Sequence, residues 1–215
     1  MSPSDRESLR QRLCAGVAEL GLALDESAIE RLLDYVELLA RWNQAYNLTA
    51  VRDPDEMLTK HVLDSLTVLP FLHGPRVLDV GTGAGLPGIP LALVRPEVQF
   101  TLLDSNGKKT RFVTHAVATL ALKNVEVLQA RAEDYHPAVP FATVLSRAFA
   151  SIGDFVRLAG HACAVDGRLL AMKGARPDAE LKELPAGFRV KAVHPLKVPG
   201  LDAERCLVEI EKTAV

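Results

Sequence analysis

Apolar residues recur at helical spacing through the N-terminal third of the chain. The first stripe predicts a helix over residues 4–20, with Ser4 and Glu7 at the spacing of a capping box. A second helix is predicted from Ser27, and a third from Asp53, a capping residue followed by proline. The three apolar stripes consist of Leu9, Leu13, Val17 and Leu20; Ile29, Leu32, Leu33, Val36, Leu39 and Ala40; and Met57, Leu58, Val62, Leu66 and Leu69. Each helix therefore has one face to bury.

From residue 76 onward the apolar positions form short runs that alternate with helical stretches. The runs predict strands at 76–80, 98–104, 125–128, 141–146 and 167–172, with helices at 86–95, 107–121 and 151–163 between them. This alternation is typical of parallel βαβ units. The tail instead predicts an antiparallel hairpin of 188–198 and 204–212. We therefore expect an α/β fold with a mainly parallel sheet at 74–215 and an N-terminal helical extension, 1–73, packed on it.

Composition and charge narrow the class of protein. Of the 215 residues, 48% are hydrophobic and 24% are charged, which is ordinary for a globular chain. No stretch is apolar for long enough to cross a bilayer, and the charged N-terminus lacks the apolar core of a signal peptide. We therefore expect a cytoplasmic protein without membrane contact. The net charge of −2 disfavours a generally basic surface, so any contact with nucleic acid has to be local.

The three cysteines predict neither disulfides nor a metal site. Cys14, Cys163 and Cys206 are far apart and show no C-x-x-C spacing. All three are interpreted as small core residues, and no bound metal is expected.

A glycine-rich segment at 77–93 carries the clearest chemical signal. Gly81, Gly83 and Gly85 directly follow an apolar strand that contains Asp79, and a predicted helix comes next. Glycine suits such a turn because it adopts positive φ and lets the backbone approach a ligand. The segment therefore predicts a binding loop for a nucleotide-like cofactor, with a fixed negative charge beside it.

Two common glycine-loop chemistries fit this segment poorly. A phosphate-binding P-loop needs G-x-x-x-x-G-K-[ST], which is absent from the chain. A dinucleotide fingerprint starting at Gly81 would need its third glycine at position 86, which is Leu86. The register from Gly83 matches the letters but begins two residues late, and Pro87 removes an amide hydrogen that pyrophosphate would need. The remaining pattern, acid-x-G-x-G-x-G, resembles the first motif of S-adenosylmethionine (SAM)-dependent methyltransferases.

Asp104 ends the next predicted strand, about twenty residues after the glycine loop. A carboxylate at this place can accept hydrogen bonds from both hydroxyls of a ribose. Both SAM and NAD contain an adenosine ribose, so Asp104 supports a nucleoside without choosing between them. A NAD-dependent oxidoreductase, a methyltransferase acting on a small molecule and a cofactor-sensing binding module all stay open at this point.

Several ordered blocks of residues resemble the RsmG (GidB) family of bacterial 16S rRNA methyltransferases. Besides the glycine loop they are Trp42-Asn43, Asn47-Leu48-Thr49, His61, Asp64-Ser65-Leu66, residues 102–112, Asn124-Val125, Arg131-Ala132-Glu133, Ser146-Arg147-Ala148 and Lys173-Gly174. The resemblance covers most of the chain. It implies a Rossmann-like class I SAM-dependent methyltransferase fold, and transfer of a methyl group to N7 of a guanine in the 530 loop of 16S rRNA in the small ribosomal subunit.

The resemblance also implies which residues form the site. Cofactor positions of the family map onto Gly81, Leu86, Ala132, Glu133 and Arg147, which join Gly83 and Asp104 from the loop and the second strand. No catalytic base is expected, because N7 of neutral guanine already carries a lone pair.

Three further residues are candidates for RNA contact: Asn47, His61 and Lys173. For His61 a packed, hydrogen-bonded histidine is an equal alternative, and Asn47 could simply cap a loop. Lys173 ends a predicted strand, where parallel sheets present ligand contacts, and we expect it to bind a phosphate.

Overall fold

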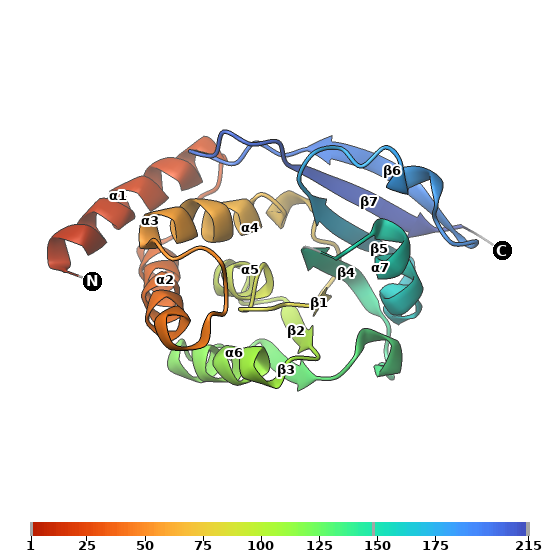
Figure 1. The fold of residues 1–215 in the computed structure, drawn as a ribbon, viewed down its shortest axis with the longest axis horizontal. Coiled ribbons are helices and arrows are strands. Elements are labelled where there is room, and N and C mark those ends of the chain that lie inside the picture. Colours follow the sequence, from red (N-terminus) through yellow and green to blue (C-terminus); the bar gives the residue numbers. More distant parts are fainter. Residues whose placement is uncertain (1, 148, 214–215) are drawn as a thin grey trace.

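The computed structural model describes residues 2–147 and 149–213, so that Ala148 of the Ser146-Arg147-Ala148 block lies outside the described residues. Seven strands form one sheet in the order β3-β2-β1-β4-β5-β7-β6 (Figure 1). The strands are β1 (Arg76–Val80), β2 (Gln99–Asp104), β3 (Val125–Gln129), β4 (Phe141–Arg147), β5 (Cys163–Lys173), β6 (Phe188–Pro195) and β7 (Cys206–Lys212). The first five are parallel, and β7 runs antiparallel to both β5 and β6. The predicted α/β fold with a closing hairpin is confirmed.

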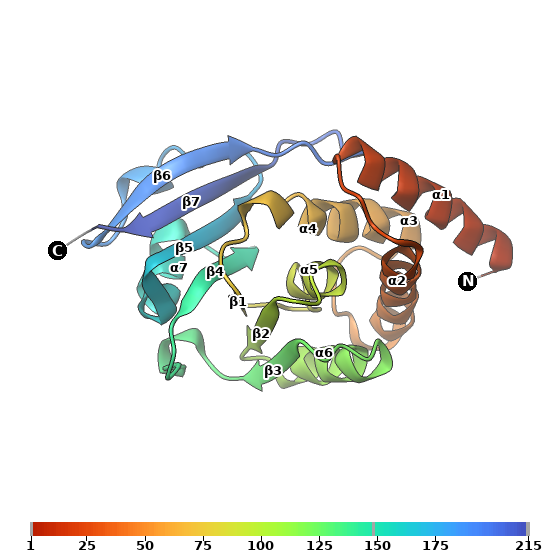
Figure 2. The ribbon, with the colours of Figure 1, turned by 180° about the vertical axis from the view of Figure 1, so that it is seen from behind.

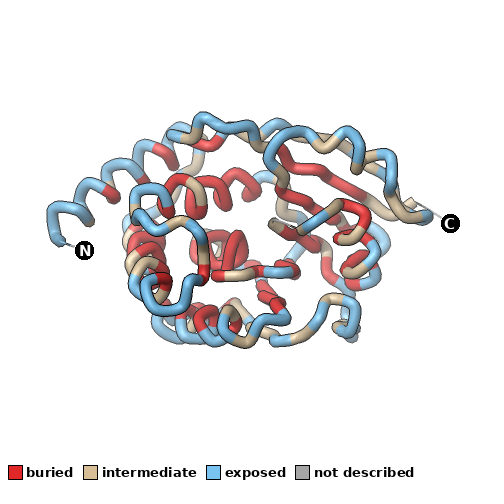
Figure 3. The backbone as a smooth tube through the Cα atoms, in the orientation of Figure 1, coloured by how far each residue is buried: buried red, intermediate tan, exposed pale blue. Residues whose placement is uncertain are grey.

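The two faces of the sheet have separate apolar cores, because successive side chains of a strand point to opposite sides. Val77 of β1 packs with the helices α5 (Gly88–Val94) and α6 (Gly107–Thr119) on one face. Leu78 of the same strand packs on the other face, where α7 (Ile152–Ala159) lies. Buried residues accordingly concentrate in the strands and in the helices against them (Figure 3).

The helices α1 (Pro3–Glu19) and α2 (Glu26–Tyr46) form as predicted, but their caps differ from the prediction. Ser2, not Ser4, begins the capping box of α1, in which its hydroxyl accepts from the amide of Asp5. Asp25, not Ser27, caps α2. In α1 the shift follows from Pro3, which is favoured at the first helical position because it has no amide hydrogen to leave unpaired.

The third predicted helix is interrupted by a wider turn. It consists of α3 (Pro54–Met57), a π-helical segment η1 (Leu58–Leu63) and α4 (Asp64–Leu66). Short π-helical turns inside α-helices are frequently found at functional sites.

The N-terminal helices share a core with the sheet. Leu13 of α1, Leu32 of α2 and Val62 of η1 are buried in the same cluster as strand residues such as Phe100. Figure 2 shows α2 and α4 on the side of the sheet that carries α5. The boundary between residues 73 and 74 stays a prediction. Of the cysteines, Cys163 and Cys206 are buried as expected, whereas Cys14 is exposed; that prediction was wrong because Cys14 follows Leu13 and so falls outside the buried stripe of α1.

Candidate functional site

The glycine loop connects β1 to α5 at the carboxyl edge of the parallel strands. Gly81, Gly83 and Gly85 have φ of 70°, 61° and 85°, which confirms the positive φ expected from the sequence. The amides of Gly81 and Thr82 donate to the carbonyl of Leu103, at 2.8 and 3.0 Å, and so attach the loop to the end of β2. The loop is therefore held on the sheet by its own backbone.

Asp79 lies beneath this loop with its side chain fully buried. Its Oδ2 accepts from the Thr82 hydroxyl at 2.7 Å and from the Gly88 amide at 2.9 Å. Its Oδ1 has no hydrogen-bond partner among the residues that the structure describes. Burial raises the pKa of Asp79 to about 6, although these two hydrogen bonds favour the carboxylate. The Asp79 carboxylate thus holds the loop by hydrogen bonds to Thr82 and Gly88. Its buried negative charge is only partly compensated, because Oδ1 has no partner among the described residues.

Gly88 is required by the close approach of its neighbours. A Cβ at this position would lie 2.2 Å from Leu102 Cδ2 and 2.7 Å from Asp79 Oδ2. This residue lay outside the predicted site, although it belongs to the glycine-rich segment. Its role in the structure is to let the first turn of α5 settle directly on the Asp79 carboxylate.

Asp104 ends β2 and fastens the same loop from the side. Its Oδ2 accepts from the Gly83 amide and its Oδ1 from the Asn106 amide, both at 2.8 Å. Each carboxylate oxygen has two lone pairs, so each can accept one further hydrogen bond. The geometry therefore leaves Asp104 able to bind a pair of hydroxyl groups.

A cavity of about 130 Å³ opens between the carboxyl ends of the first three strands. Gly81, Asp104, Ala132 and Glu133 all line it, so the structure brings these four predicted residues together. The Phe149 side chain also lines the cavity and approaches the Gly81 backbone, at 3.8 Å from where a Cβ would lie. Phe149 was missed by the sequence reasoning, because nothing local indicates that the segment after β4 reaches back to β1.

Gly83 and Leu86 do not line this cavity. Gly83 takes part through its amide, which donates to Asp104. The Leu86 side chain is only 3% exposed and packs in the apolar core. Leu86 thus anchors the loop to the apolar core on the side away from the cavity.

Arg147, at the end of β4, points toward the third helix. Its Nη1 donates to the Lys60 carbonyl at 3.1 Å and to Asp64 Oδ2 at 3.3 Å. The other oxygen of Asp64 accepts from Arg205 Nε at 3.2 Å. Burial raises the pKa of Asp64 in spite of the two guanidinium groups. Asp64 and Arg205 were not predicted as site residues, although a charged residue within the buried stretch of a helix is a signal that could have identified Asp64.

The three candidates for RNA contact lie in different surroundings. Asn47 is exposed in a left-handed conformation after α2, and its side-chain oxygen accepts from Arg52. His61 is buried, with Nε2 2.9 Å from the Thr49 hydroxyl, and burial lowers its pKa to about 4. Lys173 Nζ lies 2.9 Å from Glu180 Oε2. The packed-histidine alternative therefore describes His61 better than exposure to RNA does.

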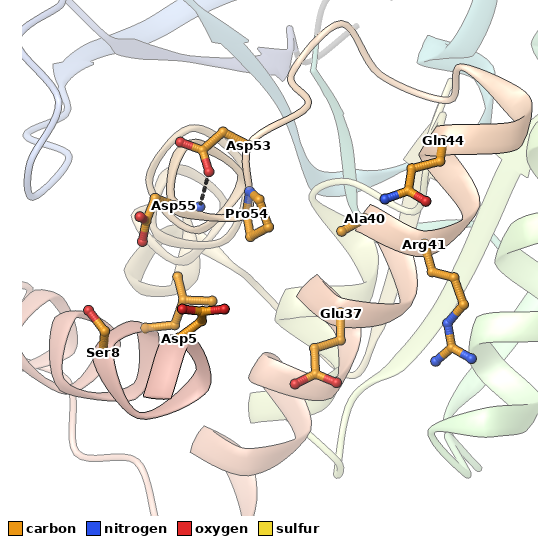
Figure 4. A pocket seen from close by; sticks show the side chains of 10 residues that line it. Asp5, Ser8, Glu37, Ala40, Arg41, Gln44, Asp53, Pro54 and Asp55 are labelled. Atoms are coloured by element: carbon orange, nitrogen blue, oxygen red, sulfur yellow. Dashed lines mark hydrogen bonds between the residues drawn. The ribbon is translucent and has the colours of Figure 1, made fainter. Parts of the chain in front are cut away.

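A larger cavity, about 600 Å³, lies between α1, α2 and α3 (Figure 4). None of the predicted site residues lines it. Four carboxylates do: Asp5, Glu37, Asp53 and Asp55. Asp53 caps α3, its carboxylate accepting from the Asp55 amide at 3.3 Å, as the dashed line in Figure 4 marks. Among the described residues of the lining, Arg41 is the one basic residue, so four carboxylates outweigh it and make this cavity unsuited to a phosphate-bearing ligand.

Comparison with known proteins identifies the family. A model of the GidB family, described as rRNA small subunit methyltransferase G, matches residues 28–208. The chain belongs to this family. Two relatives named ribosomal RNA small subunit methyltransferase G match along nearly their whole length. The relative from Pseudomonas syringae pv. syringae is 52% identical, with 95% of each chain covered. The relative from Stutzerimonas stutzeri is 50% identical, covering 97% of this chain and 98% of its own.

The fold agrees with that of a solved methyltransferase. A crystal structure of a SAM-dependent methyltransferase from Aquifex aeolicus matches with a TM-score of 0.54 and 21% identity, covering 74% of this chain and 93% of the other. At that identity the likeness shows the fold alone, and it confirms the predicted Rossmann-like class I methyltransferase fold. Together with the GidB relatives, it does not favour the NAD-dependent oxidoreductase left open by the glycine loop.

Two further findings concern only residues 2–147 and 149–213. No helix within these ranges has the length and apolar character to cross a membrane. No group of three or more histidine, cysteine, aspartate or glutamate side chains in them is arranged to hold a metal ion.

Proposed function

We propose that this protein transfers a methyl group from SAM to N7 of a guanine in the 530 loop of 16S rRNA, acting in the cytoplasm on the small ribosomal subunit. Membership of the rRNA small subunit methyltransferase G family supports the reaction class and the RNA substrate. Within the structure, the main support is the glycine loop at the carboxyl edge of the sheet. Hydrogen bonds to the carboxylates of Asp79 and Asp104 hold this loop in place.

The surroundings of the loop suit a cationic nucleoside better than a dinucleotide. Among the described residues, two carboxylates and no basic side chain accept or donate hydrogen bonds at the backbone of the loop and the first residue of α5, which favours a positively charged ligand. Pro87 follows the loop and offers no amide hydrogen to a pyrophosphate. SAM, when bound, supplies an electrophilic methyl group on a positively charged sulfur.

Each predicted residue has a role in this proposal. Asp104 accepts from the ribose hydroxyls with its remaining lone pairs. Gly81 has no side chain, so the ligand can contact its backbone directly. Ala132 and Glu133 face the base of the nucleoside from the turn after β3. Gly83 and Leu86 keep the loop in shape. Arg147 closes the end of the site near β4, where its guanidinium is held by Asp64.

The reaction at N7 makes few demands on proton transfer. The guanine nitrogen attacks with its own lone pair, so no side chain has to remove a proton, and positioning supplies the rate. Methyl transfer from bound SAM would leave the sulfur neutral and the methylated base positively charged. His61, whose pKa is lowered to about 4, stays neutral at pH 7, and Asp64 pairs with both Arg147 and Arg205. The buried residues of the third helix therefore add no positive charge of their own next to a product that is itself a cation.

Calorimetry and product mapping test the proposed function. We expect the purified protein to bind SAM and not NADH, and to add one methyl group to a guanine of the 530 loop, located by mass mapping of small-subunit RNA. Asp104→Asn should bind SAM at least about tenfold more weakly, since it loses a charge-assisted acceptor. Asp134→Asn, at an exposed carboxylate nearby, is the matched control. Binding of NADH, or binding of SAM without methylation of ribosomal RNA, would overturn the proposal.

Two of the three RNA candidates remain part of the proposal as direct contacts. Asn47 is exposed directly after α2, and Lys173 ends β5. Lys173 would exchange its present partner, Glu180, for a phosphate oxygen. We expect Lys173→Ala to weaken RNA methylation while the SAM affinity stays unchanged; a loss of SAM affinity would contradict this role. His61 enters the proposal as support for the Thr49 segment.

A further inference from the structure

Several cations without an ion-pair partner among the described residues lie in two segments of the chain. The segments 38–52 and 105–125 contain no aspartate or glutamate. They carry Arg41, Arg52, Lys108, Lys109, Arg111 and Lys123, and within the described parts of the chain none of these six is in an ion pair. Of these, Arg41 lines the acidic cavity of Figure 4, and Lys123 lies beyond the C-terminal end of α6. Most other lysines and arginines pair with carboxylates. A chain with a net charge of −2 thus has a local surface at Arg52, Lys108, Lys109 and Arg111 where no described carboxylate pairs with the cations.

The two segments lie side by side because α2 and α6 pack together in opposite directions. Near the start of α2, Arg31 donates to the carbonyl of Leu120, just beyond the end of α6, at 2.8 Å. Further along α2, Trp42 packs on Phe112, with ring centroids 5.6 Å apart. The C-terminal end of α2 therefore points toward the first turns of α6 (Figure 1). Those turns follow Asp104 directly, so this surface adjoins the proposed cofactor site.

An exposed aromatic ring stands within this surface. Tyr46, the last residue of α2, is 48% exposed, and its ring centroid lies 5.1 Å from that of Trp42. Trp42 in turn lies 4.9 Å from the His115 ring of α6. The planes of the two neighbouring ring pairs, Tyr46–Trp42 and Trp42–His115, are tilted by 32° and 35°. Tyr46 thus packs on Trp42 while about half of the residue stays exposed.

A braced aromatic ring among free cations matches the chemistry of single-stranded RNA. Bases that leave a helix stack on aromatic side chains, while lysine and arginine hold the adjacent phosphates. An exposed tyrosine alone would be unremarkable. The absence of carboxylates from both segments is the second observation, because it leaves the cations available for phosphates.

We propose that Tyr46, braced by Trp42 and His115, is a stacking platform for an unpaired base of the RNA substrate, with Lys108 and Arg111 binding the neighbouring phosphates. This inference rests on the proposed function for the identity of the RNA. It goes further in assigning the C-terminal end of α2, together with the first turns of α6, as the surface that holds the RNA while a guanine enters the site.

Substitutions of Tyr46 separate stacking from other roles. The probe is a fragment of 16S rRNA that contains the 530 loop, and affinity is measured by fluorescence anisotropy with the full-length protein. We expect Tyr46→Leu to weaken RNA binding roughly tenfold or more, as removal of one stacked base does. Tyr46→Phe keeps the ring and should stay within about twofold of the wild type. In both variants the SAM affinity and the melting temperature should be unchanged, since Tyr46 is half exposed.

Salt dependence tests the phosphate contacts. Arg111→Gln should lower the slope of log affinity against log salt by about one, as expected for the loss of one phosphate contact. The matched control is Arg157→Gln, an exposed helical arginine on α7 that pairs with Asp154. This control should leave the slope unchanged.

The outcomes distinguish this inference from the proposed function. If the wild type methylates the RNA but Tyr46→Leu binds it equally well, the platform is wrong and the function stands. If Tyr46→Phe loses as much affinity as Tyr46→Leu, the hydroxyl matters instead of stacking, and the inference is overturned. A wild type that binds SAM but neither binds nor methylates small-subunit RNA would contradict the proposed function itself.

Discussion

Asp79→Asn should make the protein more stable at neutral pH while weakening its cofactor site. The Asp79 carboxylate is fully buried, and its pKa is raised to about 6 because burial disfavours the charge. The folded state therefore binds this proton more tightly than the unfolded chain, whose aspartates titrate near pH 4. The corresponding stability is fully present below about pH 4 and is lost as pH rises through 6. A rise in pKa from near 4 to about 6 corresponds to about 3 kcal/mol.

Asparagine keeps the shape of the side chain and an oxygen that can accept from Thr82 and Gly88, but it carries no charge. We therefore expect the free energy of unfolding of the variant, relative to the wild type, to increase by about 2 to 3 kcal/mol between pH 4 and pH 8. Urea denaturation at several pH values measures this difference. Asp178→Asn, at an exposed carboxylate in a surface ion pair, is the control and should show a far smaller change.

The same substitution should weaken the binding of SAM more than that of S-adenosylhomocysteine. Both ligands share the nucleoside, but only SAM carries a positive sulfur, which the buried charge of Asp79 attracts. We expect the ratio of the two affinities to fall by about tenfold, since a charge pair near a protein interior is worth one to a few kcal/mol. A stability difference that does not depend on pH would refute the reasoning about the buried carboxylate. Equal weakening of both ligands would show that the variant had merely distorted the loop.

Three further substitutions or treatments have defined outcomes. Leu13→Ala, at a fully buried position of α1, should lower the free energy of unfolding by about 2 to 5 kcal/mol, measured by urea denaturation. Because burial lowers the pKa of His61 to about 4, its contribution to stability should be lost as pH drops from about 6.5 toward 4, opposite in sign to the contribution of Asp79. The free energy of unfolding of the wild type relative to His61→Gln should therefore fall over this range. Thiol labelling of the folded protein at pH 8 should modify exposed Cys14 and leave Cys163, whose pKa burial raises to about 11, unmodified until the protein unfolds.

The pattern along the chain was sufficient to predict the fold and the shape of the glycine loop at the candidate site. Apolar periodicity placed every strand to within a few residues, except that β5 begins at Cys163, four residues earlier than predicted. The glycine loop could be predicted because its determinants are local. Positive φ at Gly81, Gly83 and Gly85 depends on the turn itself. Asp104 could be placed because parallel strands all end at one edge of the sheet.

The partners of the charged side chains were decided only by the tertiary structure. Arg147 is held by Asp64, and Lys173 by Glu180, through contacts that no local pattern indicates. Burial of His61 depends on how the third helix packs on the segment around Thr49. Apolar periodicity and turn geometry depend on a few neighbouring residues, so they can be predicted from the local sequence. Ion pairs and burial depend on which distant segments meet, and that is settled only when the whole chain packs.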